Sequence, residues 1–473
     1  MGSRSGCRSS GGSGGAEGKS WRGTSGTPFW LDDPSRPPQR QHLDRATSTD
    51  LAIVGAGYSG LWAALLAKQQ DPDRDVVIVD ACRVGWAASG RNGGFCDASI
   101  THGDANGRDR FPDEFDTLKR LGDENLDGLI ADLDKSAIDC DLERSGELDV
   151  ATAEYQVADL RAAAEEGEGR FLDRDEVRRE VASPTYQAGL WDEHGTVMVH
   201  PGKLAWGLAR AVEELGVRIF EGTYVQGIKR ERDGVRLHTK HASLTAHQVV
   251  LATNAFPALV KRVRPFIVPV YDYALVTEPL SSQQLTAVGW RNRQGIGDTA
   301  NQFHYYRLTP DNRILFGGYD AIYHFGRKIS PALDSRPATF DLLSDHFFTT
   351  FPQLEGLAFT HAWGGAIDLC SRFCAFFGTA HGGQTAYAAG FTGLGVGATR
   401  FGAQVMLDLL SGQETERTAT RLVQTKPLPF PPEPFAYTGV QITRASIARA
   451  DRNEGRRDLW LRTLDRFGLG FDS

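Results

Sequence analysis

Short apolar runs, separated by glycine-rich turns and amphipathic stretches, occur along much of the chain. Residues 51–54 (Leu-Ala-Ile-Val) and 76–79 (Val-Val-Ile-Val) are continuous apolar runs, which are typical of strands buried in a parallel sheet. Between them lies an alanine- and leucine-rich segment that ends at Asp71-Pro72, and this segment predicts a helix. The order of strand, helix and strand predicts a βαβ unit.

The rest of the chain alternates similar elements with blocks of a different character. We expect helices over 155–166, 203–215 and 394–411, strands over 217–221, 223–229, 235–240 and 248–253, and β-rich stretches at 266–277 and 302–323. Asp233-Gly234 predicts a hairpin turn. Because α/β elements lie at both ends and in the middle, the pattern favours a discontinuous two-domain protein.

Glycine is frequent, at 53 of 473 residues, against about 7% in an average protein. Residues 1–26 hold nine of these glycines together with seven serines, so we expect residues 1–27 to be a flexible tail. Glycine remains in excess without this tail, so it must serve the folded part of the chain.

Charge and cysteine content argue against several classes of protein. The 52 Lys+Arg against 60 Asp+Glu give a net charge of −8, which argues against a nucleic-acid binder. The six Cys are too few and scattered for a secreted disulfide scaffold, and we expect a cytoplasmic protein. The apolar stretch 51–67 is shorter than the ~20 residues of a membrane helix, so we expect no membrane span.

The sequence Gly55-Ala-Gly57-Tyr-Ser-Gly60 joins the first predicted strand to its helix. In such a turn the first glycine permits the tight bend, the second lets a pyrophosphate approach the backbone, and the third lets the helix pack closely on the strand. Asp80 ends the second strand, where a carboxylate binds a ribose diol. The acid argues against a 2′-phosphate, so the motif predicts NAD or FAD.

A second glycine-rich segment, Ser89-Gly-Arg-Asn-Gly-Gly-Phe95, follows the βαβ unit. A surface loop would explain it, but its position favours a backbone cradle in which Arg91 lies near a phosphate or flavin.

A third segment, Gly390-Phe-Thr-Gly-Leu-Gly-Val-Gly397, opens the last predicted helix. Either it is only a flexible turn, or the start of the helix faces the flavin edge that becomes negative on reduction.

These motifs, with Ala252-Thr-Asn-Ala255 and Trp363-Gly-Gly365, resemble the D-amino-acid oxidase superfamily of FAD-dependent amine oxidoreductases. The loop at 89–94 and the segment Asp311-Asn-Arg-Ile-Leu-Phe-Gly-Gly318 are most similar to the gamma-glutamylputrescine oxidase-like branch. The resemblance covers about residues 28–430.

The resemblance implies an α/β fold in which a discontinuous Rossmann-like FAD-binding domain accompanies a substrate domain with a mixed, mainly antiparallel sheet and helices. We expect the FAD-binding domain at 48–105, 196–265 and 362–430, the substrate domain at 106–195 and 266–361, and a C-terminal extension at 431–473. The residues that the resemblance assigns to FAD are Gly55, Gly57, Ser59, Gly60, Asp80, Ser89, Gly90, Arg91, Asn92, Gly93, Gly94, Val225, Thr253, Asn254, Gly365, Gly390, Gly393, Leu394 and Gly395.

Relatives that attach flavin covalently use a cysteine in a stretch where this chain has Ile367, so the resemblance implies non-covalent FAD. Cys370 and Cys374 also lack metal-ligand spacing, and we expect no metal.

The implied reaction is oxidation of a C–N bond of a small amine or amino acid to an imine, by hydride transfer to flavin N5. Tyr305, Arg307 and Trp363 are the candidate residues of the substrate pocket. Arg307 could bind a substrate carboxylate or form a structural salt bridge, and the two aromatic residues could instead pack in the core. Some relatives place a lysine beside the flavin to activate oxygen, and the comparable stretch 304–307 has none. The electron acceptor is therefore either oxygen or another molecule. An amine dehydrogenase and a non-catalytic flavoprotein are the alternative functions.

Overall fold

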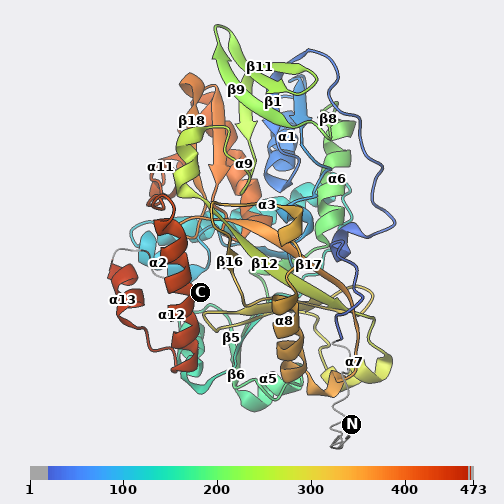
Figure 1. Cartoon of the computed structure of the whole chain (residues 1–473), viewed down its shortest axis with the longest axis vertical. Helices are drawn as coiled ribbons and strands as arrows, with labels where there is room; N and C mark the ends of the chain where they lie inside the picture. Colours follow the sequence, from blue (N-terminus) through green and yellow to red (C-terminus); the bar gives the residue numbers. More distant parts are fainter. Residues whose placement is uncertain (1–19, 467–468, 470–473) are drawn as a thin grey trace, which may run out of the picture.

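The computed structural model describes residues 20–466 and 469, so the start of the predicted tail lies outside the described residues. These residues form two large mixed sheets and a short ribbon. In Figure 1 the first sheet lies in the upper half with α1 (Tyr58–Gln70), α6 (Pro201–Glu214) and α9 (Gly395–Ser411), and the second lies below it.

The first sheet has the order β18-β19-β11-β1-β2-β8, and β10 joins β11 to β9. Its strands are β1 (Thr47–Val54), β2 (Val76–Val79), β8 (Arg218–Phe220), β9 (Val225–Glu231), β10 (Gly234–Thr239), β11 (Ser243–Leu251), β18 (Phe376–Ala380) and β19 (Thr385–Ala389). The centre is parallel, with Val54 opposite both Val79 and Leu251. The predicted βαβ unit and hairpin are therefore confirmed.

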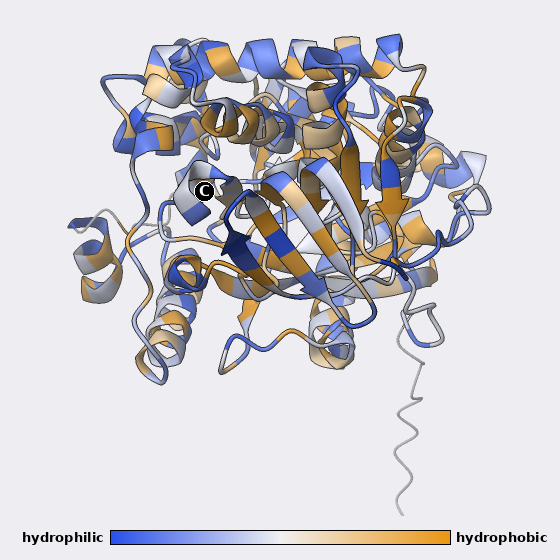
Figure 2. Ribbon diagram, turned by 90° about the horizontal axis from the view of Figure 1, so that it is seen from above, coloured by the Kyte–Doolittle hydropathy of each residue, from blue (hydrophilic) through white to orange (hydrophobic). Residues whose placement is uncertain are grey.

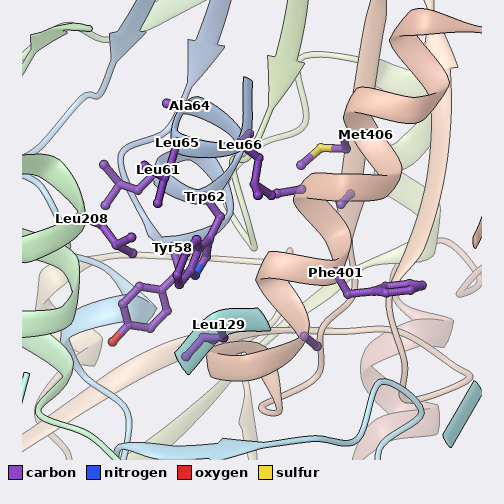
Figure 3. Packing of buried hydrophobic residues seen from close by; sticks show 14 of the residues in the cluster. Tyr58, Leu61, Trp62, Ala64, Leu65, Leu66, Leu129, Leu208, Phe401 and Met406 are labelled. Atoms are coloured by element: carbon purple, nitrogen blue, oxygen red, sulfur yellow. The ribbon is translucent and has the colours of Figure 1, made fainter. Parts of the chain in front are cut away.

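Helices α1, α6 and α9 bury apolar side chains against one another beside this sheet. Figure 3 shows Leu61, Trp62 and Leu65 of α1 lying between Leu208 of α6 and Met406 of α9. Helix α1 is buried along nearly its whole length, as expected of a helix that packs on a sheet and under other helices. This packing holds α1 and α9 beside the sheet.

The second sheet has the order β16-β12-β15-β14-β13-β4-β6-β5, and β17 pairs with β12. Its strands are β4 (Glu147–Ala151), β5 (Arg170–Leu172), β6 (Ala188–Asp192), β12 (Val268–Thr277), β13 (Gly295–Asp298), β14 (His304–Leu308), β15 (Ile314–Gly318), β16 (Ile322–Tyr323) and β17 (Phe359–Leu369). Its pairings are antiparallel except that of β13 with β4. The predicted mixed, mainly antiparallel sheet is confirmed.

Two features of this arrangement cross the predicted domain limits. The limit at residue 362 falls inside β17, which pairs with β12 along the second sheet. Helix α3 (Phe115–Lys135) comes from the segment assigned to the substrate domain, but its buried side chains share a core with α1 and α9. Both features arise from pairing between distant segments, which local patterns do not encode.

The remaining elements surround the two sheets. They are α2 (Asp104–Arg110), α4 (Val157–Glu165), α5 (Arg174–Glu180), α7 (Ser282–Val288), α8 (Pro337–Thr350), α10 (Glu416–Ala419), α11 (Arg421–Gln424), α12 (Phe435–Arg452), α13 (Leu459–Arg466) and the ribbon of β3 (Phe95–Asp97) with β7 (Thr196–Met198). The helices in Figure 2 alternate hydrophobic and hydrophilic residues, as helices packed on one face do. In the part of the chain that is described, no helix is long and apolar enough to cross a membrane.

Candidate functional site

A cavity of about 1740 Å³ is lined by residues from both large sheets. The first sheet and its loops contribute Gly57 and Val225, and the second contributes Asp272 and Trp363. The volume exceeds that of a typical small-molecule pocket, so the cavity has room for more than one ligand.

The first glycine turn has the geometry that the sequence predicts. Gly55 has φ +112°, a conformation that side chains rarely adopt, and a Cβ atom there would overlap with the carbonyl oxygen of Ala252. A Cβ atom on Gly60 would overlap with the carbonyl oxygen of Gly55, so only glycine lets α1 approach β1 this closely. Gly57 is the N-cap of α1 and lines the cavity without a side-chain cap. The positive end of the α1 dipole therefore faces the cavity.

Asp80 lines the cavity at the end of β2. Its Oδ2 accepts the N–H of Ala56 over 2.6 Å, and its Oδ1 accepts the N–H of Cys82 over 2.7 Å. Burial raises the pKa of the carboxyl, although both hydrogen bonds favour its charged form. Asp80 thus supports the glycine turn as well as facing the cavity.

The loop 89–94 is held by two tryptophans. Trp30 Nε1 donates to the carbonyl oxygen of Asn92 over 2.8 Å, and Trp363 Nε1 donates to that of Arg91 over 3.0 Å. Arg91 Nη1 lies 2.7 Å from Asp334 Oδ2, so the guanidinium already has a counter-ion. Trp30 lies far from the loop in sequence, so no local pattern predicts this contact.

The third glycine-rich segment, residues 390–397, is organised by Asp368 of β17. Its Oδ2 accepts the N–H of Gly390 over 2.6 Å. Burial raises the pKa of Asp368 to about 6, and the backbone N–H groups of the turn oppose this shift. Gly393 has φ +96°, and no atom lies within 4 Å of the position that a Cβ would take there, so the turn presents open backbone to the cavity. Sequence reasoning missed Asp368, although a carboxylate in an apolar strand was a possible signal.

Most of the predicted site residues come together. Those that line the cavity are Gly55, Gly57, Ser59, Asp80, Ser89, Arg91, Asn92, Gly93, Val225, Thr253, Asn254, Gly365, Gly393, Leu394, Gly395, Tyr305 and Trp363. Gly60, Gly90, Gly94, Gly390 and Arg307 do not line it. Trp363 is only 1% exposed, so little of its side chain reaches a ligand.

Arg307, a candidate for the substrate pocket, does not line the cavity. The side chain is 1% exposed, and its Nη1 donates to the carbonyl oxygen of Val199 over 2.8 Å. Its Nε donates to the carbonyl oxygen of Leu308 over 3.2 Å. Burial lowers the pKa of Arg307 to about 10, so it is still a cation at neutral pH. The guanidinium therefore binds backbone carbonyl groups in the protein interior and does not face the cavity.

An acidic wall, which we define as Asp97, Glu147 and Asp149, forms another part of the cavity. Thr196 Oγ1 lies 2.5 Å from Asp97 Oδ1 and 3.2 Å from Glu147 Oε2. Burial raises the pKa of all three carboxyls, that of Asp149 to about 7, and repulsion from Asp97 adds to the shifts of Glu147 and Asp149. A cationic occupant would relieve this repulsion. The residues of the wall come from β3 and β4, so no local pattern in the sequence predicts it.

The C-terminal segment closes a further side of the cavity. Phe435, Val440 and Trp460 of α12 and α13 are among the lining residues. Asp451 of α12 accepts the backbone N–H of Asn301 over 3.1 Å, so α12 is tied to a loop of the second sheet. The predicted C-terminal extension thus contributes directly to the cavity.

Comparisons with known proteins agree with this geometry. The family model described as DAO, FAD dependent oxidoreductase, matches residues 50–409. The gamma-glutamylputrescine oxidoreductase of Escherichia coli (strain K12) is 31% identical over 387 residues, which are 78% of this chain and 85% of that protein. A probable oxidoreductase, OrdL, of Haemophilus influenzae is 27% identical over 82% of this chain and 88% of its own length.

Solved structures share the fold. Glycine oxidase from Geobacillus kaustophilus superimposes with a TM-score of 0.66 at 20% identity, over 81% of this chain and 100% of that one. L-proline dehydrogenase from P. horikoshii gives a TM-score of 0.63 at 17% identity, over 78% of this chain and 95% of that one. The predicted fold class is therefore confirmed.

Proposed function

Because the chain belongs to the DAO family of FAD dependent oxidoreductases, we propose that it oxidises a C–N bond of a small amine or amino acid to an imine. The observation that carries the proposal is the cavity itself. It is bordered by the uncapped starts of α1 and α9 and by the acidic wall. The helix starts suit an anionic cofactor, and the wall suits a cationic substrate.

The residues present fit FAD. The start of α1 at Gly57 would hold the pyrophosphate, and Asp80 would face the ribose. The start of α9 at Leu394 would face the flavin. The Oδ1 atom of Asn254 is buried without a hydrogen-bond partner among the described residues and belongs to a cavity-lining side chain, as expected of a group that meets a ligand.

We propose that FAD is bound without a covalent link. Cys370 and Cys374, which precede the glycine-rich segment 390–397, are buried and do not line the cavity, whereas Ile367 does. Acid precipitation of the yellow protein should release the flavin into the supernatant. A flavin that stays with the pellet would contradict this proposal.

When bound, FAD supplies the hydride acceptor at its N5 atom, and this leaves the substrate as an imine. The protein's own task is then to orient the amine and to exclude water. Tyr305 and Phe391 contribute aromatic surface to the cavity, and the acidic wall attracts the ammonium group.

The names of the relatives support an amine or amino acid as substrate. The similar Escherichia coli protein is named for gamma-glutamylputrescine, and the structural neighbours include a glycine oxidase and an L-proline dehydrogenase. The latter name keeps a dehydrogenase with an acceptor other than oxygen as the second candidate. The absence of lysine from residues 304–307 favours that alternative.

Anaerobic bleaching of the bound flavin tests the proposal. At least one amine in a panel of putrescine, sarcosine and D-alanine should bleach the visible absorption band of the flavin at about 450 nm. Admission of air should then restore the colour and release peroxide from an oxidase, whereas a dehydrogenase needs a dye or quinone. If these and further amines and amino acids all leave the flavin yellow, the protein is a non-catalytic flavoprotein.

A further inference from the structure

Strand β12 presents a carboxylate to the cavity. Side chains alternate between the faces of a strand, and Val270, Asp272 and Ala274 all line the cavity. The partner of Asp272 on β17 is Gly365, which has no side chain to cover it. Asp272 is therefore a charged group on an otherwise apolar part of this strand.

The carboxylate is held by defined hydrogen bonds. Tyr305 Oη of β14 donates to Asp272 Oδ2 over 2.7 Å, and the N–H of Tyr273 donates to Asp272 Oδ1 over 2.8 Å. The backbone N–H of Gly318 is a third donor, and because the two oxygens have four lone pairs together, the carboxylate retains the capacity to accept one more hydrogen bond.

Tyr305 links this carboxylate to the glycine loop. A Cβ atom on Gly93 would lie 2.8 Å from the Tyr305 ring, and one on Gly317 would lie 2.6 Å from it. The ring therefore fits between two glycines, and this fixes its hydroxyl on Asp272. Since residues 89–94 are proposed to border the flavin, Asp272 lies on the side of the cavity where the reaction is proposed to occur.

The electrostatic surroundings give Asp272 the character of a base near neutral pH. Burial raises its pKa to about 6, while the hydrogen bonds from Tyr305 and the backbone, and the nearby imidazole of His304, oppose this shift. Burial beside Asp272 also raises the pKa of Tyr305 well above its usual value, so the phenol remains a donor. Arg91, which packs on Gly365, is paired with Asp334.

An amine reaches an enzyme at neutral pH mainly as its ammonium ion, which has no lone pair on nitrogen. We infer that the Asp272 carboxylate accepts the proton that the substrate ammonium must lose, and that Tyr305 positions this carboxylate. One N–H bond breaks, its electron pair stays on nitrogen, and one O–H bond forms on Asp272. The inference rests on the proposed function, because it concerns the same amine.

Infrared difference spectra of the FAD-loaded protein test the acceptor without turnover. We expect a protonated-carboxyl component with a midpoint near pH 6 that Asp272→Asn lacks, whereas the similar component of Asp368 should remain in this variant. Tyr305→Phe should move the midpoint to higher pH, because the lost hydrogen bond favours the charged form. The matched control is Tyr306→Phe, on the same strand, whose hydroxyl bonds Tyr186 over 2.7 Å. If the wild-type and Asp272→Asn spectra do not differ near pH 6, the inference is overturned.

The rate of anaerobic flavin reduction, measured from pH 6 to 9 with the amine that reduces the wild type best, tests the role. Asp272→Asn should reduce the flavin about 100-fold more slowly at pH 7, since a positioned base typically contributes that much. The deficit should shrink about tenfold with each pH unit as the free amine becomes more abundant. A deficit that is constant across pH, or no deficit, overturns the inference.

The two proposals fail in different ways. If no amine reduces the wild type, the proposed function fails, and the infrared titration still reports whether Asp272 is a base near pH 6. If Asp272→Asn does not fold, Tyr305→Phe provides the test, because it retains the carboxylate. The acid limb of its rate profile should lie at a higher pH than that of the wild type. An unshifted limb in Tyr305→Phe contradicts the positioning role.

Discussion

The indole nitrogen of Trp363 lies 3.0 Å from the carbonyl oxygen of Arg91, and this hydrogen bond joins the second sheet to the loop of the first. Trp363 is buried in β17, so the loop takes its position from a strand of the other sheet. The loop 89–94 is therefore positioned by tertiary contacts as well as by its glycines.

Replacement of Trp363 by Phe should weaken FAD binding about tenfold. The change leaves a buried carbonyl oxygen of Arg91 without its donor, which costs about 1–2 kcal/mol. The measurement is fluorescence titration of the FAD-free protein with FAD. Trp62→Phe is the matched control, because the Trp62 indole nitrogen is buried without a partner in the described part of the chain. Equal losses in the two variants would contradict this account.

Two glycines of the same motif should respond differently to alanine. At Gly57 the added Cβ meets only the Ser89 hydroxyl, at 2.9 Å, and this side chain can move. Gly57→Ala should therefore fold, with the melting temperature of the FAD-free protein little changed, but bind FAD at least about tenfold more weakly. Retention of full flavin content by Gly57→Ala would contradict the assignment of this turn to the pyrophosphate.

At Gly60 the added Cβ overlaps with the backbone of Gly55, which has no freedom to move. Gly60→Ala should therefore destabilise the FAD-free protein by about 3 kcal/mol, measured by urea unfolding. Gly227→Ala is the control, because no atom lies within 4 Å of its Cβ position. If Gly60→Ala were as stable as this control, the close approach of α1 and β1 would be wrong.

Replacement of Arg307 by Met should reduce stability without changing substrate affinity. It leaves the buried carbonyl oxygens of Val199 and Leu308 without their donor, at a cost of about 2–4 kcal/mol. Urea unfolding measures this loss, and the amine concentration that half-saturates flavin reduction should be unchanged. A raised half-saturation concentration in a stable variant would instead support a role of Arg307 in substrate binding.

The acidic wall should make stability depend on pH. Asp149 has a pKa of about 7 when folded, above its ordinary 3.8, so the folded state binds more protons than the unfolded state between these values. Stability from this group is present at low pH and is lost as pH rises, by up to about 1.4 kcal/mol per pH unit. Asp149→Asn should therefore raise the melting temperature of the FAD-free protein at pH 8 and leave it nearly unchanged at pH 4.

The control for this prediction is Asp113→Asn, at a side chain that is 86% exposed. It should not change the melting temperature at either pH. A lower melting temperature of Asp149→Asn at pH 8 would mean that the charged carboxylate stabilises the fold.

The nucleotide-binding half of the molecule is specified by residues that are neighbours in the chain. The strands at 51–54 and 76–79, α1 and the turn at Gly55–Gly60 all follow from such residues. These features depend on local sterics, because a turn with φ +112° at Gly55 needs glycine whatever surrounds it. Local patterns were therefore enough to predict this turn, at which we propose that the cofactor binds.

The substrate side, in contrast, depends on tertiary packing. Asp97 and Glu147 form the acidic wall, and Asp272 meets Tyr305, through strand pairings between distant segments. The same packing turned Arg307 into the interior and placed Trp30 on the glycine loop. A charged side chain looks the same in sequence whether it faces a cavity or a buried carbonyl group. Its role depends on the register of strands far apart in the chain, which no local pattern specifies.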